Sequence, residues 1–366
     1  MTPNPAAVDR KYIARALNLA RRALYTTDPN PRVGCVLTQS GDVVGEGWHE
    51  RAGEPHAEVM ALRAAGARAR GATAYVSLEP CSHTGRTPPC ADALIAAGVA
   101  RVVCGSLDPS PKVSGAGLAR LEAAGIAVEA GVLEEEARQL NPGFFSRFER
   151  GRPYVRLKMA MTMDARTAPA TGAQLWISGE AARADVQTLR ARSSAVLTGS
   201  GTVRSDDPGL DVRLDYGPWV RQPLRVVLDT ELSCPAGAKV FKDGHSMIFA
   251  ATDAAAAASR VSGNHTTIER VSRASGGLDL DAVIAKLTQL EINELLLECG
   301  PTLAGAFVAR GLVDEWVIYV APKFLGDDAA PLLRARFGAD SLAAYEFRDV
   351  RRIGDDVRLT LNLKKA

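Results

Sequence analysis

Apolar and polar residues alternate with helical and strand periods along most of the chain. Residues 9–24 carry apolar side chains at helical spacing, which predicts an amphipathic helix packed on a sheet. Residues 33–37 and 42–48 are predicted strands joined by a turn. Further strands are predicted at 74–78, 101–105 and 126–130, and helices at 57–65, 91–97, 117–124 and 133–140. Strands that alternate with helices in this way predict a three-layer α/β domain.

The second half starts a new series of elements. Asn141-Pro142-Gly143 is expected to end a helix, and residues 144–153 lack a clear period. Because 366 residues exceed a typical single core, we expect two domains, residues 1–148 and 149–366. The second is predicted to contain strands at 154–162, 195–197, 224–228, 247–250 and 295–297 and helices at 180–192 and 280–290, with Ser178 as an N-cap.

The most informative stretch for chemistry runs from residue 55 to residue 98. His56-Ala57-Glu58 is followed by Pro80-Cys81 and then by Pro89-Cys90. Pro55 and the apolar run after it predict that His56 and Glu58 lie in the first turn of a helix. Cys81 is predicted on a loop after a strand. Cys90 is predicted at a helix start, where the helix dipole favours a thiolate.

These residue types suit a zinc ion. Zinc prefers imidazole and thiolate ligands, and a catalytic zinc takes three of them and keeps a fourth position open for water. His56, Cys81 and Cys90 would supply the three ligands, and Glu58 would be the carboxylate that moves protons. Spacing alone does not bring His56 and Glu58 together, because residues two apart on a helix do not share a face. A structural zinc site with His83 as fourth ligand, or buried cysteines without a metal, are the alternatives.

The same stretch resembles a known family. Zinc deaminases of nucleobases carry His-x-Glu followed by Pro-Cys-x-x-Cys, whereas here eight residues separate Cys81 from Cys90. That longer spacing, together with Asn30-Pro31-x-Val33-Gly34, resembles the deaminase half of the RibD family, the bifunctional deaminase/reductases of riboflavin biosynthesis. The resemblance implies a cytidine-deaminase-like three-layer α/β/α domain with Asn30 and His49 in the pyrimidine pocket. Asn30 would equally suit a turn before a proline.

The second half resembles the reductase half of the same family. The matching motifs are Lys158-Met159-Ala160, Asp164-x-Arg166-Thr167, Trp176-Ile177, Thr202-Val203-x-x-Asp206-Asp207-Pro208, Pro223-x-Arg225-Val226-Val227-Leu228-Asp229 and Glu298-x-Gly300-Pro301-Thr302-Leu303. The resemblance implies a dihydrofolate-reductase-like α/β domain that uses NADPH. Its implied cofactor contacts are Ala160, Trp176, Thr202, Asp206, Thr230, Gly300, Pro301, Thr302, Leu303, Ala304, Gly305 and Ala306.

The implied substrate contacts of the reductase half are Lys158, Gln174, Arg190, Leu210, Arg213 and Glu298. Gln174 departs from the family, which often has a serine there. Lys158 and Asp206 are candidates for polar assistance near the sugar. Arginine suits a phosphorylated substrate because its planar fork binds oxyanions in pairs. The alternatives are a solvated helix face for Arg190 and a surface loop charge for Arg213.

Two short patterns are weak by themselves. Residues 199–203 begin like a Gly-x-Gly-x-x-Gly loop, but the pattern breaks at Arg204, so it is not a Rossmann fingerprint. Gly300-Pro301 follows a buried strand and begins a helix with small residues, which would let a phosphate approach the free N–H groups. The alternative interpretation of these residues is a tight strand-to-helix turn that binds no ligand.

Charge and cysteine content limit the partners. The net charge is +2, from 44 basic and 42 acidic residues, which gives no basic footprint for nucleic acid. This balance disfavours the rival assignment, a zinc deaminase acting on a base in tRNA or DNA. Six cysteines do not form a disulfide framework in a chain of this size, and no uncharged 18-residue span is present. We therefore expect a cytoplasmic protein without a membrane or nucleic-acid partner, assembled as a homo-oligomer, either a dimer or a tetramer.

The predicted activity has two steps. The first is the zinc-dependent deamination of 2,5-diamino-6-(5-phosphoribosylamino)pyrimidin-4-one. The second is the reduction of 5-amino-6-(5-phosphoribosylamino)uracil by NADPH. The resemblance thus implies a small phosphorylated pyrimidine as the substrate and Zn²⁺ and NADPH as the cofactors. In a further rival assignment, a non-catalytic zinc module is joined to a nucleotide-binding domain, and Glu58 would then have no role.

Overall fold

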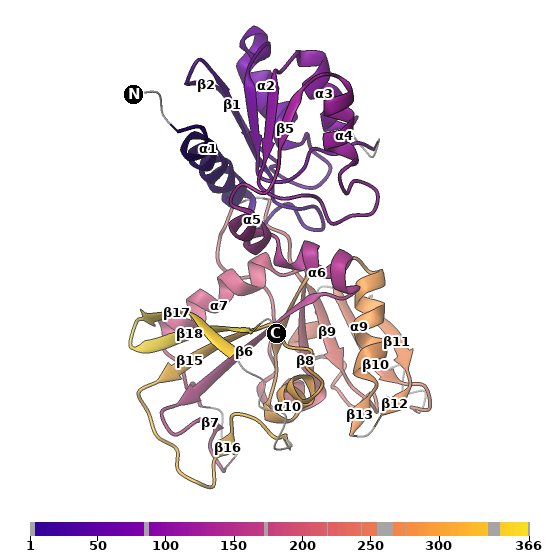
Figure 1. Ribbon diagram of the computed structural model, residues 1–366. Helices are drawn as coiled ribbons and strands as arrows, with labels where there is room; N and C mark the ends of the chain where they lie inside the picture. The colour runs from indigo at the N-terminus through magenta and orange to yellow at the C-terminus, as the bar shows by residue number, and fades with distance from the viewer. Residues whose placement is uncertain are drawn as a thin grey trace. The chain divides into compact units, whose positions relative to one another are not determined.

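The computed structural model describes residues 4–83, 88–171, 175–217, 219–242, 244–254, 266–274, 276–335 and 345–364. The chain forms two compact units, Met1–Gly151 and Arg152–Ala366 (Figure 1). The boundary expected between residues 148 and 149 lies inside helix α6 (Pro142–Arg150), in a stretch whose sequence showed no clear period. Asn141-Pro142 begins this helix, because proline fits the first helical turn.

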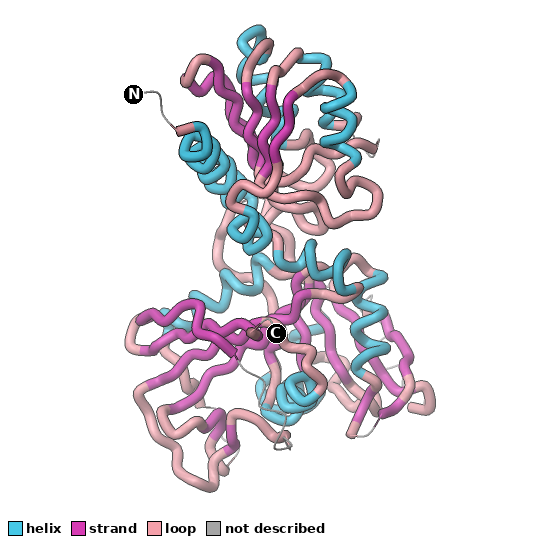
Figure 2. The backbone as a smooth tube through the Cα atoms, viewed as in Figure 1, coloured by secondary structure: helices cyan, strands magenta, loops and turns pink. Residues whose placement is uncertain are grey.

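The first unit is built on one five-stranded sheet with the order β2-β1-β3-β4-β5. β1 is antiparallel to both neighbours, and β3, β4 and β5 are parallel. Helices cover both faces (Figure 2), which confirms the predicted three-layer α/β/α architecture. The elements are α1 (Pro5–Ala20), β1 (Gly34–Gln39), β2 (Asp42–Trp48), α2 (Ala57–Ala65), β3 (Thr73–Val76), α3 (Cys90–Ala97), β4 (Arg101–Cys104), α4 (Ala116–Ala123), β5 (Ala127–Glu129), α5 (Glu134–Leu140) and α6, with short 3-10 turns η1 (Arg21–Ala23) and η2 (Gly66–Ala69).

Alternate residues of β1 contribute to two cores. Cys35 and Leu37 pack in a cluster with residues of α2, α3 and α4. Val36, between them, packs on the other face with Tyr12 and Leu17 of α1. This alternation follows from the two-residue period of a strand, and it explains why β1 carries apolar residues at successive positions.

Two glycines of β2 let helix α2 lie directly on the sheet. A Cβ added at Gly47 would come within 2.5 Å of Met60 Cβ and 2.6 Å of the Ala57 carbonyl oxygen. At Gly45 the Ala61 carbonyl oxygen would be 2.3 Å away. Any larger residue would displace the helix, so these glycines determine where the N-terminus of α2 lies.

The second unit has a nine-stranded sheet with the order β11-β10-β9-β8-β14-β6-β15-β18-β17. Strands from β11 to β15 in this order are parallel, and β18 and β17 add an antiparallel ribbon. The main strands are β6 (Tyr154–Thr162), β8 (Ala195–Gly199), β9 (Leu224–Leu228), β10 (Ser246–Ala251), β11 (Thr267–Val271), β14 (Glu294–Glu298), β15 (Glu315–Ala321), β17 (Tyr345–Ile353) and β18 (Asp356–Leu363). The helices are α7 (Glu180–Arg192), α8 (Ser200–Asp206), α9 (Leu280–Gln289), α10 (Pro301–Ala309) and the 3-10 turn η3 (Lys239–Phe241). Two small sheets pair β7 (Arg166–Ala168) with β16 (Ala330–Pro331) and β12 (Arg273–Ala274) with β13 (Gly277–Leu278).

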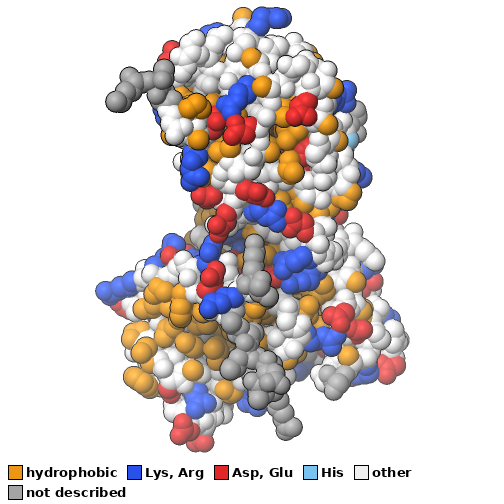
Figure 3. All heavy atoms as spheres, viewed as in Figure 1, with side chains coloured by type: hydrophobic (Ala, Val, Ile, Leu, Met, Phe, Trp, Pro, Cys, Tyr) orange, Lys and Arg blue, Asp and Glu red, His pale blue; other side chains and the backbone are white. Residues whose placement is uncertain are grey.

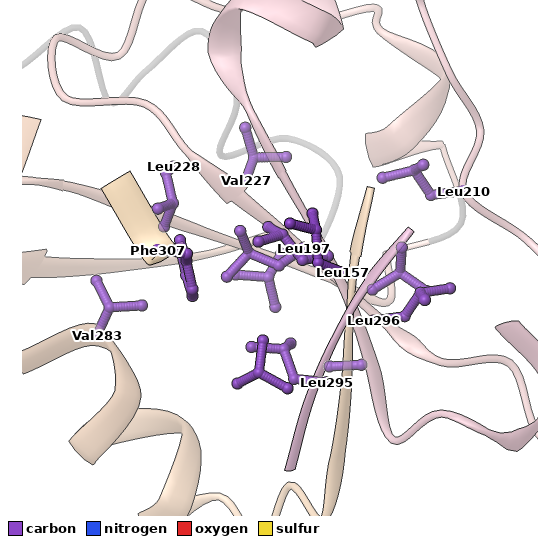
Figure 4. Close-up of a cluster of buried hydrophobic side chains, with 14 of the residues drawn as sticks. Leu157, Leu197, Leu210, Val227, Leu228, Val283, Leu295, Leu296 and Phe307 are labelled. Carbon is purple, nitrogen blue, oxygen red and sulfur yellow. The ribbon is translucent and has the colours of Figure 1, made fainter. Parts of the chain in front are cut away.

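Leucine and aromatic side chains fill the core of this unit. Leu157, Leu197 and Leu295 come from three adjacent parallel strands and are fully buried, together with Phe307 of α10 (Figure 4). Strands buried on both faces read as continuous apolar runs, which is why the central strands were predictable.

The start of α7 differs from the prediction. Gly179, and not Ser178, is its N-cap, and no side chain caps the helix. Instead the Gly179 amide donates to Asp356 Oδ2 of β18 at 2.7 Å. A residue 177 positions away therefore binds the backbone amide of the N-cap itself.

All six cysteines are free thiols, as expected for a chain without a disulfide framework. None of the helices that the structure describes combines the length and apolar character needed to cross a bilayer.

Candidate active sites

The first candidate site lies where α2, the loop after β3 and α3 meet. His56, Cys81 and Cys90 bring one donor atom each within 4.8 Å of one another. His56 Nδ1 is 3.2 Å from Cys90 Sγ and 3.7 Å from Cys81 Sγ. In the part of the chain that the structure describes, these three residues form the group able to hold a metal, and the exposed His83 is outside it.

Backbone geometry explains the convergence. His56 is the N-cap of α2 and has an extended backbone (φ −72°, ψ 164°). Its side chain therefore does not follow the direction that the helix imposes on the Glu58 side chain. This resolves the objection that residues two apart on a helix do not share a face. Cys90 is the first residue of α3, and its amide donates to Cys81 Sγ at 3.3 Å. The Ala91 amide also donates to the Cys81 carbonyl oxygen.

The electrostatics of the three donors suit a zinc ion. The hydrogen bond from the Cys90 thiol lowers the pKa of Cys81 well below its usual range, while the same contact raises the pKa of Cys90. The hydrogen bond with Cys81 raises the pKa of His56. One thiolate beside an imidazole and a second sulfur is a soft donor set, and three such ligands fit zinc with a position left for water.

Glu58 lies beside this group in the first turn of α2 and is buried. Burial raises its pKa to about 7. Its Oε2 atom has no hydrogen-bond partner among the described residues. A buried carboxylate oxygen without a partner is costly for stability, so its retention points to a role in a reaction.

His49 and Asn30 form a polar pair next to the three donors. The His49 ring lies 5.1 Å from the His56 ring, edge to face. His49 Nδ1 donates to the Pro55 carbonyl oxygen at 3.2 Å, so its Nε2 accepts from Asn30 Nδ2 at 3.1 Å. Burial lowers the pKa of His49 to about 4, which keeps this ring neutral. The amide nitrogen of Asn30 is thus used by His49, which leaves the side-chain oxygen Oδ1 as the acceptor of this pair.

Sequence reasoning missed a second buried carboxylate, Glu79. Its two oxygens accept four backbone N–H groups, from Asp108, Gly115, Gly117 and Leu118. It therefore fastens the loop before α4 to the loop that carries Cys81. Its position directly before Pro80-Cys81 was visible in the sequence, but its partners, about 30 to 40 residues further on, were not.

The second candidate site lies at the carboxyl ends of parallel strands. Thr202, Thr230 and Gly300 follow β8, β9 and β14, and Ala160 lies near the end of β6. These four strands are neighbours in the order β9-β8-β14-β6. In open α/β sheets, ligands bind outside the carboxyl ends of such strands. The topology thus brings these predicted cofactor contacts to one edge.

Small residues let the two helix starts at this edge approach each other. A Cβ at Gly300 would be 3.8 Å from Thr202 Oγ1, and a Cβ at Gly199 would be 3.3 Å from Leu303. Gly305 packs against the backbone of Arg334, because a Cβ at residue 305 would be 2.3 Å from the Arg334 carbonyl oxygen. No side chain caps the start of the nine-residue α10, and its small residues would let a phosphate approach the free N–H groups there, which fits a dinucleotide cofactor.

Predicted substrate residues meet beside the same edge. Glu298 accepts a bidentate pair from Arg190 at 2.6 and 3.0 Å. Burial alone would raise the pKa of Glu298, but Arg190 and then Lys158 lower it. Burial lowers the pKa of Lys158, whose Nζ is 5.9 Å from the Tyr319 ring centre. Lys158, Arg190 and Glu298 thus form one charged cluster on the sheet.

Other predicted contacts have varied surroundings. Trp176 is 73% exposed and stacks with Arg183 at 4.9 Å. Asp206, the last residue of α8, is exposed. Leu210 is buried, whereas the Arg213 side chain is 60% exposed. Gln174 lies outside the described residues.

Together, the fold and these two sites define a two-unit α/β enzyme with a zinc-deaminase unit followed by a nucleotide-dependent reductase unit. Family models support each half. Residues 6–106 match the cytidine and deoxycytidylate deaminase zinc-binding region. Residues 153–359 match the RibD C-terminal domain.

The chain belongs to the RibD family and is a bifunctional deaminase/reductase of riboflavin biosynthesis. It is 48% identical to the riboflavin biosynthesis protein RibD of Escherichia coli, over 96% of this chain and 99% of that protein. The crystal form 1 structure of Acinetobacter baumannii RibD has a TM-score of 0.91 at 42% identity, covering 98% of this chain and 100% of that one. A Thermotoga maritima structure, described as a diaminohydroxyphosphoribosylaminopyrimidine deaminase/5-amino-6-(5-phosphoribosylamino)uracil reductase, has a TM-score of 0.86 at 30% identity, covering 99% and 100%. Zinc and NADPH are the cofactors of this class of enzyme, and the rival assignment to tRNA or DNA is not favoured.

Proposed function

We propose that the first unit deaminates 2,5-diamino-6-(5-phosphoribosylamino)pyrimidin-4-one at the site formed by His56, Cys81, Cys90 and Glu58. The single observation that carries this proposal is the convergence of three soft donors beside a buried carboxylate oxygen without a partner. Zinc on these donors would supply a water molecule acidic enough to act as a nucleophile near neutral pH. The printed name of the Thermotoga maritima relative supports the choice of substrate.

In this mechanism each residue has a separate task. Glu58 Oε2 accepts the proton of the attacking water and returns protons to the ring nitrogen and the departing ammonia. Asn30 and His49 orient the pyrimidine, because the neutral His49 ring holds the Asn30 amide in one direction. Burial of Glu58 excludes competing water from the carboxylate.

For the second unit we propose reduction of the ribosyl group of 5-amino-6-(5-phosphoribosylamino)uracil. NADPH supplies the hydride, and the protein binds and orients both molecules. The proposed cofactor contacts are Ala160, Trp176, Thr202, Asp206, Thr230 and residues 300–306. The proposed substrate contacts are Lys158, Gln174, Arg190, Leu210, Arg213 and Glu298. Support comes from the shared strand edge and from the Lys158, Arg190 and Glu298 cluster.

The test is to supply the diaminopyrimidine phosphate with and without NADPH and to identify the products by mass spectrometry. Without NADPH we expect ammonia and the deaminated ribosylamino product. With NADPH we expect the ribityl product. If NADPH is consumed without prior release of ammonia, the proposed order of the two steps is wrong.

We further infer a cytoplasmic homo-oligomer, a dimer or tetramer. Six free thiols support a reducing compartment.

Phe347 and Val350 of β17 are 65% and 59% exposed and pair with Leu361 and Leu359 of β18. Orange side chains gather over this ribbon in Figure 3. An exposed apolar strand face favours association. Sedimentation of the wild type and of Phe347→Asp tests this: a monomeric wild type would contradict it.

A further inference from the structure

An open cavity of about 210 Å³ at the surface of the second unit is lined mostly by cations. It is lined by Gly209, Asp211, Arg213, Arg225, Lys239 and Lys242. Four of these six residues are basic and one is acidic. The nearby Asp207 is the second carboxylate, with an oxygen 3.3 Å from Lys239 Nζ. Four cations against two carboxylates leave an excess positive charge that matches a dianion.

The cavity is built on ordered backbone and one buried cation. Arg225 of β9 is only 4% exposed, and its Nε donates to the His245 carbonyl oxygen at 3.3 Å. The Lys239 amide donates to Asp207 Oδ1 at 2.8 Å, which ties the η3 turn to the loop after α8. Gln222 bonds both backbone groups of Val212 at 2.8 and 2.9 Å. Three separate chain segments are thus held around the cavity.

The cavity is next to the proposed reductase site. Arg190 Nη1 donates to the Asp211 carbonyl oxygen at 3.1 Å, and the Arg213 amide donates to Gln187 of the same helix at 2.9 Å. Glu298 already occupies two other donors of Arg190. A phosphate bound near this site therefore needs cations other than Arg190. Asp211, whose carbonyl oxygen Arg190 contacts, also lines the cavity.

The volume of the cavity and its basic side chains indicate which class of ligand it binds. Pockets that enclose a whole drug-sized ligand measure roughly 300–1,000 Å³, so this smaller cavity suits one charged group of a larger molecule. Arginine binds phosphate oxygens with its fork, and lysine binds them as a point charge. We propose that Arg225, Lys239 and Lys242, together with Arg213, bind the phosphate monoester of a ligand of the reductase unit.

This inference rests on the proposed reductase function, which offers two sources of the phosphate monoester. One is the 5-phosphate of the ribosyl substrate, and the other is the 2′-phosphate of NADPH. Lys239 and Lys242 line the cavity and are not among the proposed cofactor or substrate contacts. Substitution of both lysines distinguishes the two sources, because the binding of each phosphate can be measured with its own small-molecule probe.

The experiment compares the full-length wild type with the double variant Lys239→Gln/Lys242→Gln. Titration calorimetry measures the binding of ribose 5-phosphate and of adenosine 2′,5′-bisphosphate to each protein. Loss of charge-assisted hydrogen bonds should weaken one probe by about tenfold or more. Lys239→Arg/Lys242→Arg should restore binding. Lys286→Gln, which loses an ion pair with Glu269 outside the cavity, is the matched control and should bind as the wild type does.

The two sources predict different outcomes. Weaker binding of ribose 5-phosphate alone, with a raised KM for the ribosyl substrate, assigns the cavity to the substrate. Weaker binding of adenosine 2′,5′-bisphosphate alone, with a reduced preference for NADPH over NADH, assigns it to the cofactor. Unchanged binding of both probes overturns the inference. Turnover by the wild type tests the proposed function separately, so the two can fail independently.

Discussion

The two units assemble their candidate sites in opposite ways. The first unit takes its metal donors and its carboxylate from one stretch, residues 56 to 90, placed on two helix starts and one loop. The second takes its candidate contacts from the ends of four strands, from helices α7, α8 and α10 and from the loops between them, across residues 158–306. The first site thus depends on a few side chains that lie close together in the sequence, whereas the second shares its binding groups among side chains and backbone of several elements.

This difference indicates how strongly a single substitution should affect the activity of each site. A single side chain removes a donor or a proton acceptor from the first site. The second site shares its groups among several strands and the charged cluster of Lys158, Arg190 and Glu298. We therefore expect substitutions near residues 56–90 to abolish one activity and leave the other intact.

The largest expected effect is on the metal donors. Cys90→Ser should reduce the zinc content from about one ion per chain to nearly none, because three protein ligands hold a catalytic zinc. Ammonia release should then be lost, and reduction of the deaminated substrate should continue at the wild-type rate. Metal analysis of the purified variant provides the first measurement and NADPH absorbance the second. Full zinc retention would contradict the assigned ligand set.

Glu58→Gln should have the next largest effect. It keeps the shape and burial of the side chain but removes the proton acceptor, which contributes typically about 10²- to 10⁴-fold to a rate. The turnover number for ammonia release should fall by that factor while zinc content stays unchanged. A parallel loss of NADPH oxidation would break the comparison, because it would show that the two sites depend on each other.

Gly47→Ala tests the backbone support of the first site. Its new Cβ would come within 2.5 Å of Met60 Cβ and force α2 away from the sheet. Overpacking of this kind costs typically about 1–3 kcal/mol, and the same shift moves His56 and Glu58. We expect a lower melting temperature and reduced deamination. Gly237→Ala is the control, because its Cβ would meet nothing within 4 Å.

The smallest expected effect concerns pH. Burial, and then the Glu79 charge, raise the pKa of Asp108 to about 7. The unfolded side chain titrates near 4. The folded state therefore holds the proton more tightly, and its stability decreases as pH rises from about 4 to 7. Asp108→Asn should add on the order of 1 kcal/mol to the free energy of unfolding at pH 8 and less at pH 5. Calorimetry of both proteins at both pH values measures it, and an equal gain would exclude titration as the cause.

Several features were predictable because their causes are local. The apolar runs of β6, β9 and β14 indicated buried parallel strands, and Pro55 and Pro89 marked the helix starts that carry His56 and Cys90. Helix α6 was missed because Asn141-Pro142-Gly143 was interpreted as the end of a helix, whereas Pro142 begins α6, whose Phe144 and Phe145 are buried against residues distant in sequence. Ser178 was predicted as the N-cap on local grounds, but Gly179 is the N-cap, and its amide donates to Asp356 on a distant strand.

By itself, the sequence determined which residue types could do chemistry, since imidazole, thiolate and carboxylate at that spacing favour zinc whatever surrounds them. Tertiary structure alone decided that the donors converge, because Gly45 and Gly47 allow α2 to lie on β2 and the extended backbone of His56 turns its ring toward the sulfurs. It also decided that Glu79 would hold a distant loop and that four basic residues from three segments would share one cavity. Such contacts join residues far apart in the chain, and only the packing of the sheets brings them within reach.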